Sequence, residues 1–92
     1  MMNSLPDHVM AYKKTPVFTQ GSMPPGLLKT HKTKQGVWGV LSVLEGSVVF
    51  CPEQEDAKKI KLSAGDQWVI QPDQEHHLEL DGLVSCYVEF YK

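Results

Sequence analysis

The hydrophobic positions of this chain recur in short alternating runs rather than at helical spacing. No window of eleven or more residues keeps a 3.6-residue period, whereas eight short runs are rich in β-branched and aromatic residues. Turn-forming Gly, Pro and Asp residues separate the runs. This pattern predicts an all-β sandwich or barrel with little or no helix. The runs cover residues 16–19, 27–33, 37–44, 47–51, 59–62, 67–71, 76–80 and 83–91.

Four turn signals lie between these runs. "EG" at Glu45-Gly46 and "DG" at Asp81-Gly82 are each expected to form a tight hairpin between two strands. "SAGD" and "PDQE", residues 63–66 and 72–75, are expected to be turns. The charged stretch "PEQEDAK", residues 52–58, predicts an exposed loop or one short helical turn.

The stretch "QPDQEHHLEL" contains two adjacent histidines in one predicted strand. Side chains alternate between the two faces of a strand, so His76 shares a face with two leucines and His77 shares the other with two carboxylates. We therefore expect His76 to point into the core and His77 to face water. The same rule divides the last strand into a core set and a second set whose surroundings stay open: interior, interface or outer face. The second set is Ser85, Tyr87, Glu89 and Tyr91.

Composition narrows the class of protein. The 92 residues suit one small domain, and 41% hydrophobic with 22% charged residues is typical of a soluble globular chain. No apolar run reaches the roughly 18 residues of a membrane span. The nine basic residues are all lysine, which disfavours nucleic-acid binding because arginine is the usual reader of guanine and phosphate. The lysines of "KTHKTK" predict a solvated edge.

The N-terminal residues and the two cysteines both bear on the cellular location of the protein. Residues 1–11 are expected to be a mobile segment preceding a single domain at residues 12–92, and they lack the pattern of a signal peptide. A cytoplasmic location follows as an expectation. Cys51 and Cys86 have no metal-knuckle spacing and are expected to be small, reduced core residues.

Three stretches together resemble one family. "YKKTPVFT", "PPGLLKTHKTKQGVWGVLSVLEGSV" and "VIQPDQEHHLEL" are similar to a small cupin-like family associated with tellurite resistance, which occurs alone and as the N-terminal domain of a methyltransferase. The resemblance covers residues 12–92 and implies a double-stranded β-helix, or jelly-roll, barrel. It also implies a zinc, nickel or iron ion in the barrel mouth, held by the matching residues His31 and His76.

Departures from the general cupin pattern leave that metal site incomplete. Thr33 and Gly39 stand where the first cupin motif supplies a second histidine and a glutamate. Glu89 is the best candidate for the missing ligand, and Cys51 and Glu45 are further candidates. An exposed carboxylate is the alternative for Glu89.

Three functions remain open at this point. The favoured one is a binding module that holds a metal ion or a small anionic ligand such as an oxyanion, with Trp38 and Tyr87 in the pocket wall. The second is a metal-dependent enzyme of the dioxygenase or isomerase type, with His31, His76 and Glu89 as a facial triad. The third is a homodimer, or a partner of a separate methyltransferase, that docks through apolar and aromatic edge strands such as "CYVEFYK".

The first function is favoured because the sequence lacks the motifs of several enzyme classes. It contains no nucleophile and base pair, no phosphate loop and no Gly-rich strand and helix unit for S-adenosylmethionine. We therefore expect no methyltransferase activity, and a non-enzymatic role. A part in tellurite stress is implied by the family alone.

Overall fold

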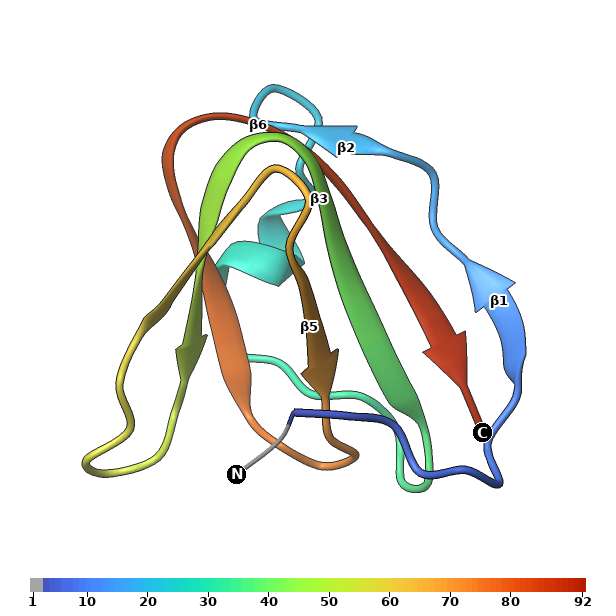
Figure 1. Ribbon diagram of the computed structural model, residues 1–92. Coiled ribbons are helices and arrows are strands. Elements are labelled where there is room, and N and C mark those ends of the chain that lie inside the picture. Colours follow the sequence, from blue (N-terminus) through green and yellow to red (C-terminus); the bar gives the residue numbers. More distant parts are fainter. Residues whose placement is uncertain (1–2) are drawn as a thin grey trace.

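The chain folds into an antiparallel six-stranded β structure, and the computed structural model describes residues 3–92 of it (Figure 1). One 3-10 turn interrupts the strands, and residues 3–92 include no α-helix. No helix in this described part is long and apolar enough to cross a membrane. The elements are β1 (Ala11–Lys14), β2 (Phe18–Thr19), η1 (Pro25–Leu28), β3 (Trp38–Pro52), β4 (Ile60–Ser63), β5 (Gln67–Ile70) and β6 (His76–Tyr91).

The two long strands β3 and β6 form the frame of the fold. They pair antiparallel from Trp38 opposite Tyr91 to Pro52 opposite His76, and Figure 1 shows them as two arches that bend together at the top. β5 and β4 pair with the first and second arms of β3, and β1 and β2 pair with the second arm of β6. The core lies between the two arms.

The predicted hairpins at Glu45-Gly46 and Asp81-Gly82 are wrong. Both turn signals lie inside continuous strands, at the shared bend, where the β3 and β6 register shifts on either side of Gly46. Gly46 has a φ of 67°, and a Cβ there would lie 1.7 Å from the carbonyl oxygen of Leu83. The glycine therefore permits a bulged bend and a close strand contact rather than a chain reversal. Four of the eight expected strands therefore merge into the two long strands β3 and β6.

The run at residues 27–33 is also not a strand. Two prolines and a glycine start the 3-10 turn η1, and the only sheet contact that follows is an isolated bridge between His31 and His76. The turn at residues 63–66 is confirmed by the 2.8 Å bond from the Asp66 N–H to the Ser63 carbonyl. The predicted turn before β6 is present as well, with Asp73 at a φ of 60°, and residues 53–58 form an exposed loop.

The strand order also corrects the expected interface. The order β1-β6-β3-β4 places β6 inside the sheet, between β1 and β3. The segment "CYVEFYK" is therefore not an edge strand whose backbone could pair with a partner.

The face assignments on β6 are largely confirmed. His76 and Leu78 are buried, and His77 is partly exposed on the other face. Leu80 is the exception, because it lies near the bend and is 38% exposed. On the last arm the core set is confirmed, and both cysteines are buried and unpaired as expected. Buried residues of the core are Met23, Leu41, Val43, Val48, Phe50, Leu62, Ile70, Leu78, Val84, Cys86 and Val88.

Part of the segment before residue 12 packs against the sheet. The Asn3 side chain accepts from the Val69 N–H at 2.6 Å and donates to the Val69 carbonyl at 3.0 Å, as a neighbouring strand would. Met10 exchanges two backbone hydrogen bonds of 3.1 Å with Lys92. These contacts join the start of the chain to β5 and to the end of the chain.

Candidate ligand site in the sheet interior

The structure brings His31 and His76 together, although 45 positions separate them in the sequence. Their backbones form a two-way bridge, with N–H to carbonyl distances of 2.8 and 2.9 Å. The ring centroids lie 4.2 Å apart, at an interplanar angle of 65°. The residues that the family resemblance selected are thus direct neighbours, held by the start of β6 and the loop after η1.

Each imidazole is fixed by a backbone carbonyl. His76 Nδ1 lies 2.7 Å from the Gln74 oxygen, and His31 Nδ1 lies 2.8 Å from the Lys29 oxygen. A carbonyl oxygen only accepts, so Nδ1 carries the proton in both rings. When the rings are neutral, Nε2 then presents a lone pair. Nε2 has no hydrogen-bond partner within residues 3–92 in either ring.

His76 is the more enclosed of the two histidines. It is 2% exposed and its ring stacks on Phe50 at a centroid distance of 4.9 Å. Burial lowers the pKa of His76, and the hydrogen bond to Gln74 opposes this only in part. His76 is therefore neutral at pH 7 and offers an acceptor nitrogen.

A cavity of about 450 Å³ opens next to the two histidines. Apolar side chains of η1, β5 and β6 form part of its wall, and four lysines from both ends of the chain and from the loop after η1 form the polar part. No carboxylate is present among the lining residues that the structure describes. The lining is Tyr12, Lys13, Leu27, His31, Lys32, Thr33, Lys34, Val37, Ile70, His76, Val88, Phe90 and Lys92.

Three of the residues expected at the site do not line this cavity. Glu89 and Val88 point to opposite faces of β6. Glu89 accepts a 3.1 Å hydrogen bond from the Tyr91 hydroxyl and borders a separate shallow groove beside β1. The Tyr87 ring, on the same face, lies 4.3 Å from Lys14 Nζ. Trp38 lies opposite Tyr91 at the start of β3.

The lysines of the cavity are the feature that the sequence did not reveal. "KTHKTK" predicts a solvated edge, and Lys32 and Lys34 are indeed exposed, but both also border the cavity. Lys13 and Lys92 join them only through the pairing of β1 with β6. No local pattern in the sequence could show that convergence.

The donor set can be compared with known kinds of metal site. His31 and His76 supply two nitrogens, and the lining residues supply no carboxylate or thiol. Structural zinc takes four ligands, and a non-haem ferrous centre takes two histidines and a carboxylate. The cavity therefore does not assemble a facial triad, and two imidazoles make at most an open site.

The chain has a small cupin-like fold. A cupin-2 domain protein from Shewanella frigidimarina superposes with a TM-score of 0.58 over 94% of this chain and 72% of its own, at 17% identity. The family is more specific. Residues 13–88 match the family described as TehB-like domain, and the chain belongs to that family.

The chain is similar to one protein of about its own length and to TehB proteins that are longer. A protein of E. coli strain K12 superposes with a TM-score of 0.88 at 24% identity, covering 99% of this chain and 97% of that one. TehB from Haemophilus influenzae superposes with a TM-score of 0.84 at 27% identity, covering 92% of this chain and 32% of that one. A probable S-adenosyl-L-methionine-dependent methyltransferase TehB of H. influenzae strain 10810 is 30% identical over 90 residues. The chain spans about a third of the length of these TehB relatives.

Proposed function

We propose that this domain is a non-enzymatic binding module for a small anion that carries at least one hydroxyl group. The observation that supports this most directly is the cavity lining, in which four lysines, two histidines and one threonine are the main polar groups and no Asp or Glu is present among the described lining residues. Such a lining is positive overall, so it attracts anions.

The two kinds of polar group have separate tasks in this proposal. The lysine ammonium groups pair with the negative charge of the ligand. Nε2 of neutral His76 accepts a hydrogen bond from a ligand hydroxyl, because Nδ1 already donates to a backbone carbonyl. The apolar wall, with Ile70 and Val88, lowers the local dielectric and strengthens both interactions.

Hydrogen tellurite has this chemistry, since it combines a negative charge with a hydroxyl group. We therefore propose tellurite, or a related weak oxyacid, as the ligand, and a role in oxyanion stress in the cytoplasm. Both cysteines are free, which agrees with a reducing compartment.

A metal ion at His31 and His76 is the second candidate. Both rings are held through Nδ1 by carbonyls, as the outer shell of metal-binding histidines usually is. The ligand anion would then complete the coordination of zinc, nickel or iron. A catalytic role, as in a dioxygenase or isomerase, would need a carboxylate that the described cavity lining does not supply.

We also propose self-association as a homodimer. Leu44 and Leu83 lie at the shared bend of β3 and β6 and are 49% and 61% exposed. Burying such residues against a second copy would remove apolar surface from water. Size-exclusion chromatography with light scattering tests this, and a strict monomer at micromolar concentration would argue against it.

Calorimetric titration with tellurite, selenite and a small hydroxy acid tests the anion proposal, with chloride as the reference. We expect saturable binding that His76→Gln weakens about two- to tenfold, because the variant removes the imidazole Nε2 acceptor and so one hydrogen bond to the ligand hydroxyl. His8→Gln is the matched control, because His8 is exposed and outside the cavity. Dialysis of the complex removes an anion that is bound reversibly, whereas an anion that has reacted with a cysteine stays on the protein. Equal affinities of both variants, or no saturable binding, would reject the proposal.

A further inference from the structure

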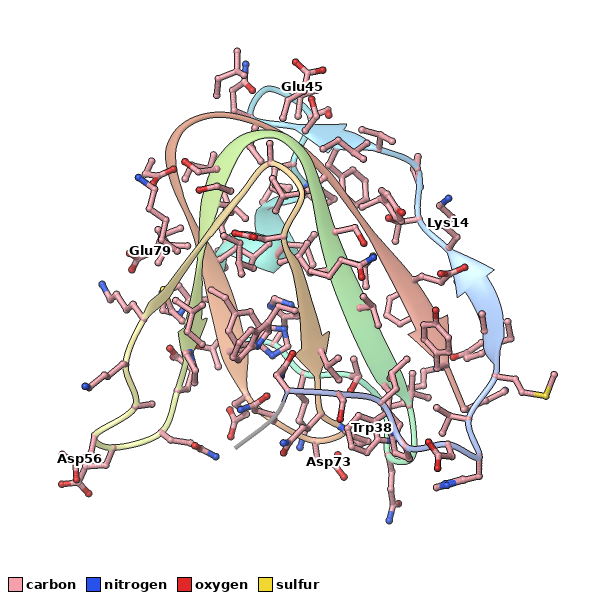
Figure 2. All side chains as sticks on the ribbon, in the orientation of Figure 1. Lys14, Trp38, Glu45, Asp56, Asp73 and Glu79 are labelled. Carbon is pink, nitrogen blue, oxygen red and sulfur yellow. The ribbon has the colours of Figure 1, made fainter. Side chains whose placement is uncertain are left out.

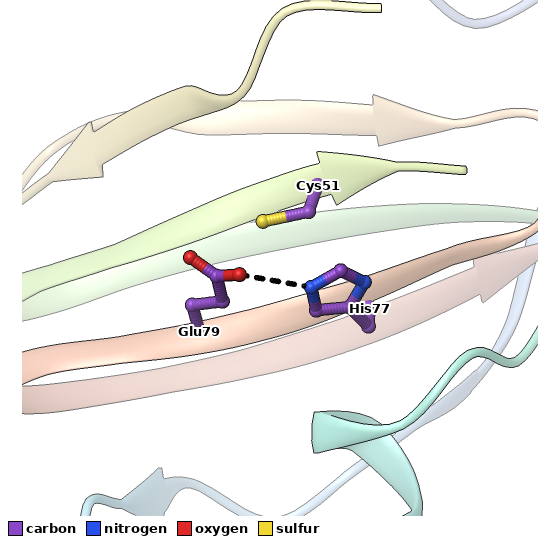
Figure 3. Close-up of side chains that lie close together, drawn as sticks. All are labelled: Cys51, His77 and Glu79. Atoms are coloured by element: carbon purple, nitrogen blue, oxygen red, sulfur yellow. Dashed lines mark hydrogen bonds and ion pairs between the residues drawn. The ribbon is translucent and has the colours of Figure 1, made fainter. Parts of the chain in front are cut away.

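A second group of metal-ligating side chains lies on the other face of the same strands. Cys51 on β3 is directly opposite His77 on β6, and Glu79 follows two residues later on the same face (Figure 3). The Sγ atom, an imidazole nitrogen and a carboxylate oxygen of the three all lie within 4.8 Å of one another. None of the three lines the interior cavity.

His77 is held for a ligand role by a carboxylate outside this group. Its Nδ1 lies 2.6 Å from Glu53 Oε1, and the Thr30 hydroxyl donates to the other oxygen of Glu53 at 2.5 Å. Its Nε2 lies 3.1 Å from Glu79 Oε2, and Figure 3 shows this contact beside the Cys51 sulfur. A carboxylate on the second ring nitrogen is the usual outer-shell partner of a metal-binding histidine.

The distances are close to those that a tetrahedral zinc ion imposes. Zinc bonds of about 2.0–2.3 Å separate neighbouring ligand atoms by roughly 3.3–3.6 Å. His77 Nε2 and Glu79 Oε2, 3.1 Å apart, are slightly closer than that range and need to separate by a few tenths of an ångström. The Cys51 Sγ atom needs a shift of at most on the order of 1 Å, which a small side-chain rotation can supply. Thiolate, imidazole and carboxylate together favour zinc over magnesium or calcium.

We propose that Cys51, His77 and Glu79 form a zinc site, open to solvent at its fourth position, with Glu53 as the residue that positions His77. The site is independent of the interior cavity and of the function proposed for it. It links β3 to β6 next to the exposed loop at residues 53–58.

Zinc binding preserves the formal charge of the group. Without metal, both nitrogens of His77 face carboxylates, so both carry protons, and the Cys51 thiol carries one as well. Zinc displaces the proton on Nε2 and the thiol proton, and both go to solvent. Two positive protons are exchanged for one divalent cation, so no uncompensated charge is created in the sheet.

Lys59 competes with a bound zinc ion for the Glu79 carboxylate. Its Nζ lies 3.1 and 3.2 Å from the two oxygens of Glu79, so it competes for the carboxylate and repels a cation. Replacing Lys59 with Gln is therefore expected to tighten zinc binding about two- to fivefold, as for an exposed ion pair. Lys61→Gln is the matched control, because Lys61 pairs with Asp81 instead.

Cobalt substitution of the full chain tests the site, because a cobalt–thiolate bond gives a charge-transfer band in the near ultraviolet. We expect one equivalent of cobalt to produce this band in the wild type and in His31→Gln. Cys51→Ser should abolish the band, and His77→Gln should weaken binding at least tenfold. Glu53→Gln should weaken it about 10- to 100-fold while keeping the band, as for other outer-shell carboxylates.

Three outcomes would overturn the proposal. One is a wild type without a thiolate band at saturating cobalt, and another is a band that persists in Cys51→Ser. The third is a Lys59→Gln variant that binds more weakly than Lys61→Gln. His77 is partly exposed, so His77→Gln is expected to fold even if Cys51→Ser, which alters a buried residue, does not.

Discussion

His76 and His77 are consecutive in the chain and occupy opposite electrostatic environments. His76 stacks on Phe50 in the interior, with its Nδ1 on a backbone carbonyl. His77 lies between the carboxylates of Glu53 and Glu79 on the other face of the strand. Figure 2 shows the Glu79 side chain pointing outward, away from the space between the two arms. The difference arises because successive side chains of a strand point to opposite faces.

The two histidines should give opposite contributions to the pH dependence of stability. Burial lowers the pKa of His76 in the folded state, so its contribution is present above the unfolded pKa near 6.5 and is lost as the pH falls. The bond to Glu79, and then that to Glu53, raises the pKa of His77. Its contribution is present below pH 6.5 and is lost as the pH rises through the folded value.

Denaturation of metal-free protein between about pH 5 and 8 measures both contributions. We expect His76→Gln to flatten the loss of stability on the acid side and His77→Gln to steepen it. Glutamine does not titrate, so the slope against pH is informative even if a variant is less stable overall. Equal slopes in the two variants would contradict the assignment of faces.

The inward and outward placement of these histidines could be predicted from the sequence because it depends on one strand. The bend at Gly46 could not, because "EG" and "DG" signal a change of direction but not its kind. Whether the chain reverses or only bends depends on the long pairing of β3 with β6. That pairing joins residues far apart in the sequence, 43 positions for Val43 and Cys86 and 38 positions for Gly46 and Val84 at the bend. That pairing is a tertiary property.

The sequence predicted only part of the site, because several of its residues are distant in the chain. The family resemblance selected His31 and His76, which are neighbours in the fold. Alternation already grouped Glu89 apart from the core residue Val88, but it could not tell whether the face of Glu89 was a second interior face, an interface or the outer face. The cavity lysines come from distant parts of the chain, so only the folded structure brings them together.

Gly46→Ala tests the bend directly. The added Cβ would lie 1.7 Å from the Leu83 carbonyl oxygen and 2.6 Å from its carbon, so β3 and β6 must separate. We expect a loss of about 3 kcal/mol or more in the free energy of unfolding. Gly65→Ala is the control, since it has a φ of 93° but no atom within 4 Å of the new Cβ, and should cost only about 1–2 kcal/mol. Equal losses would show that close strand contact is not the constraint.

Asn3→Ala tests the attachment of the chain start to β5. The variant removes both hydrogen bonds between the Asn3 side chain and the Val69 backbone. We expect a loss of about 1 kcal/mol and faster amide exchange at Val69. The β5 amides that bond to β3 should keep their protection. Unchanged exchange at Val69 would indicate that the contact is not formed in solution.

The cavity lysines predict a dependence of anion affinity on salt. Lys32 and Lys34 are exposed, so their attraction for a bound anion is screened by ions, and raising the salt from about 0.05 to 0.5 M should weaken binding severalfold. Lys32→Gln and Lys34→Gln should each weaken binding about two- to fivefold at low salt, and the difference from wild type should shrink at high salt. Lys58→Gln changes the net charge equally but lies in the exposed loop outside the cavity, so it separates a local effect from a general one. If Lys58→Gln weakened binding as much as the other two variants, the lysines would act only through net charge, and the cavity would not be the anion site.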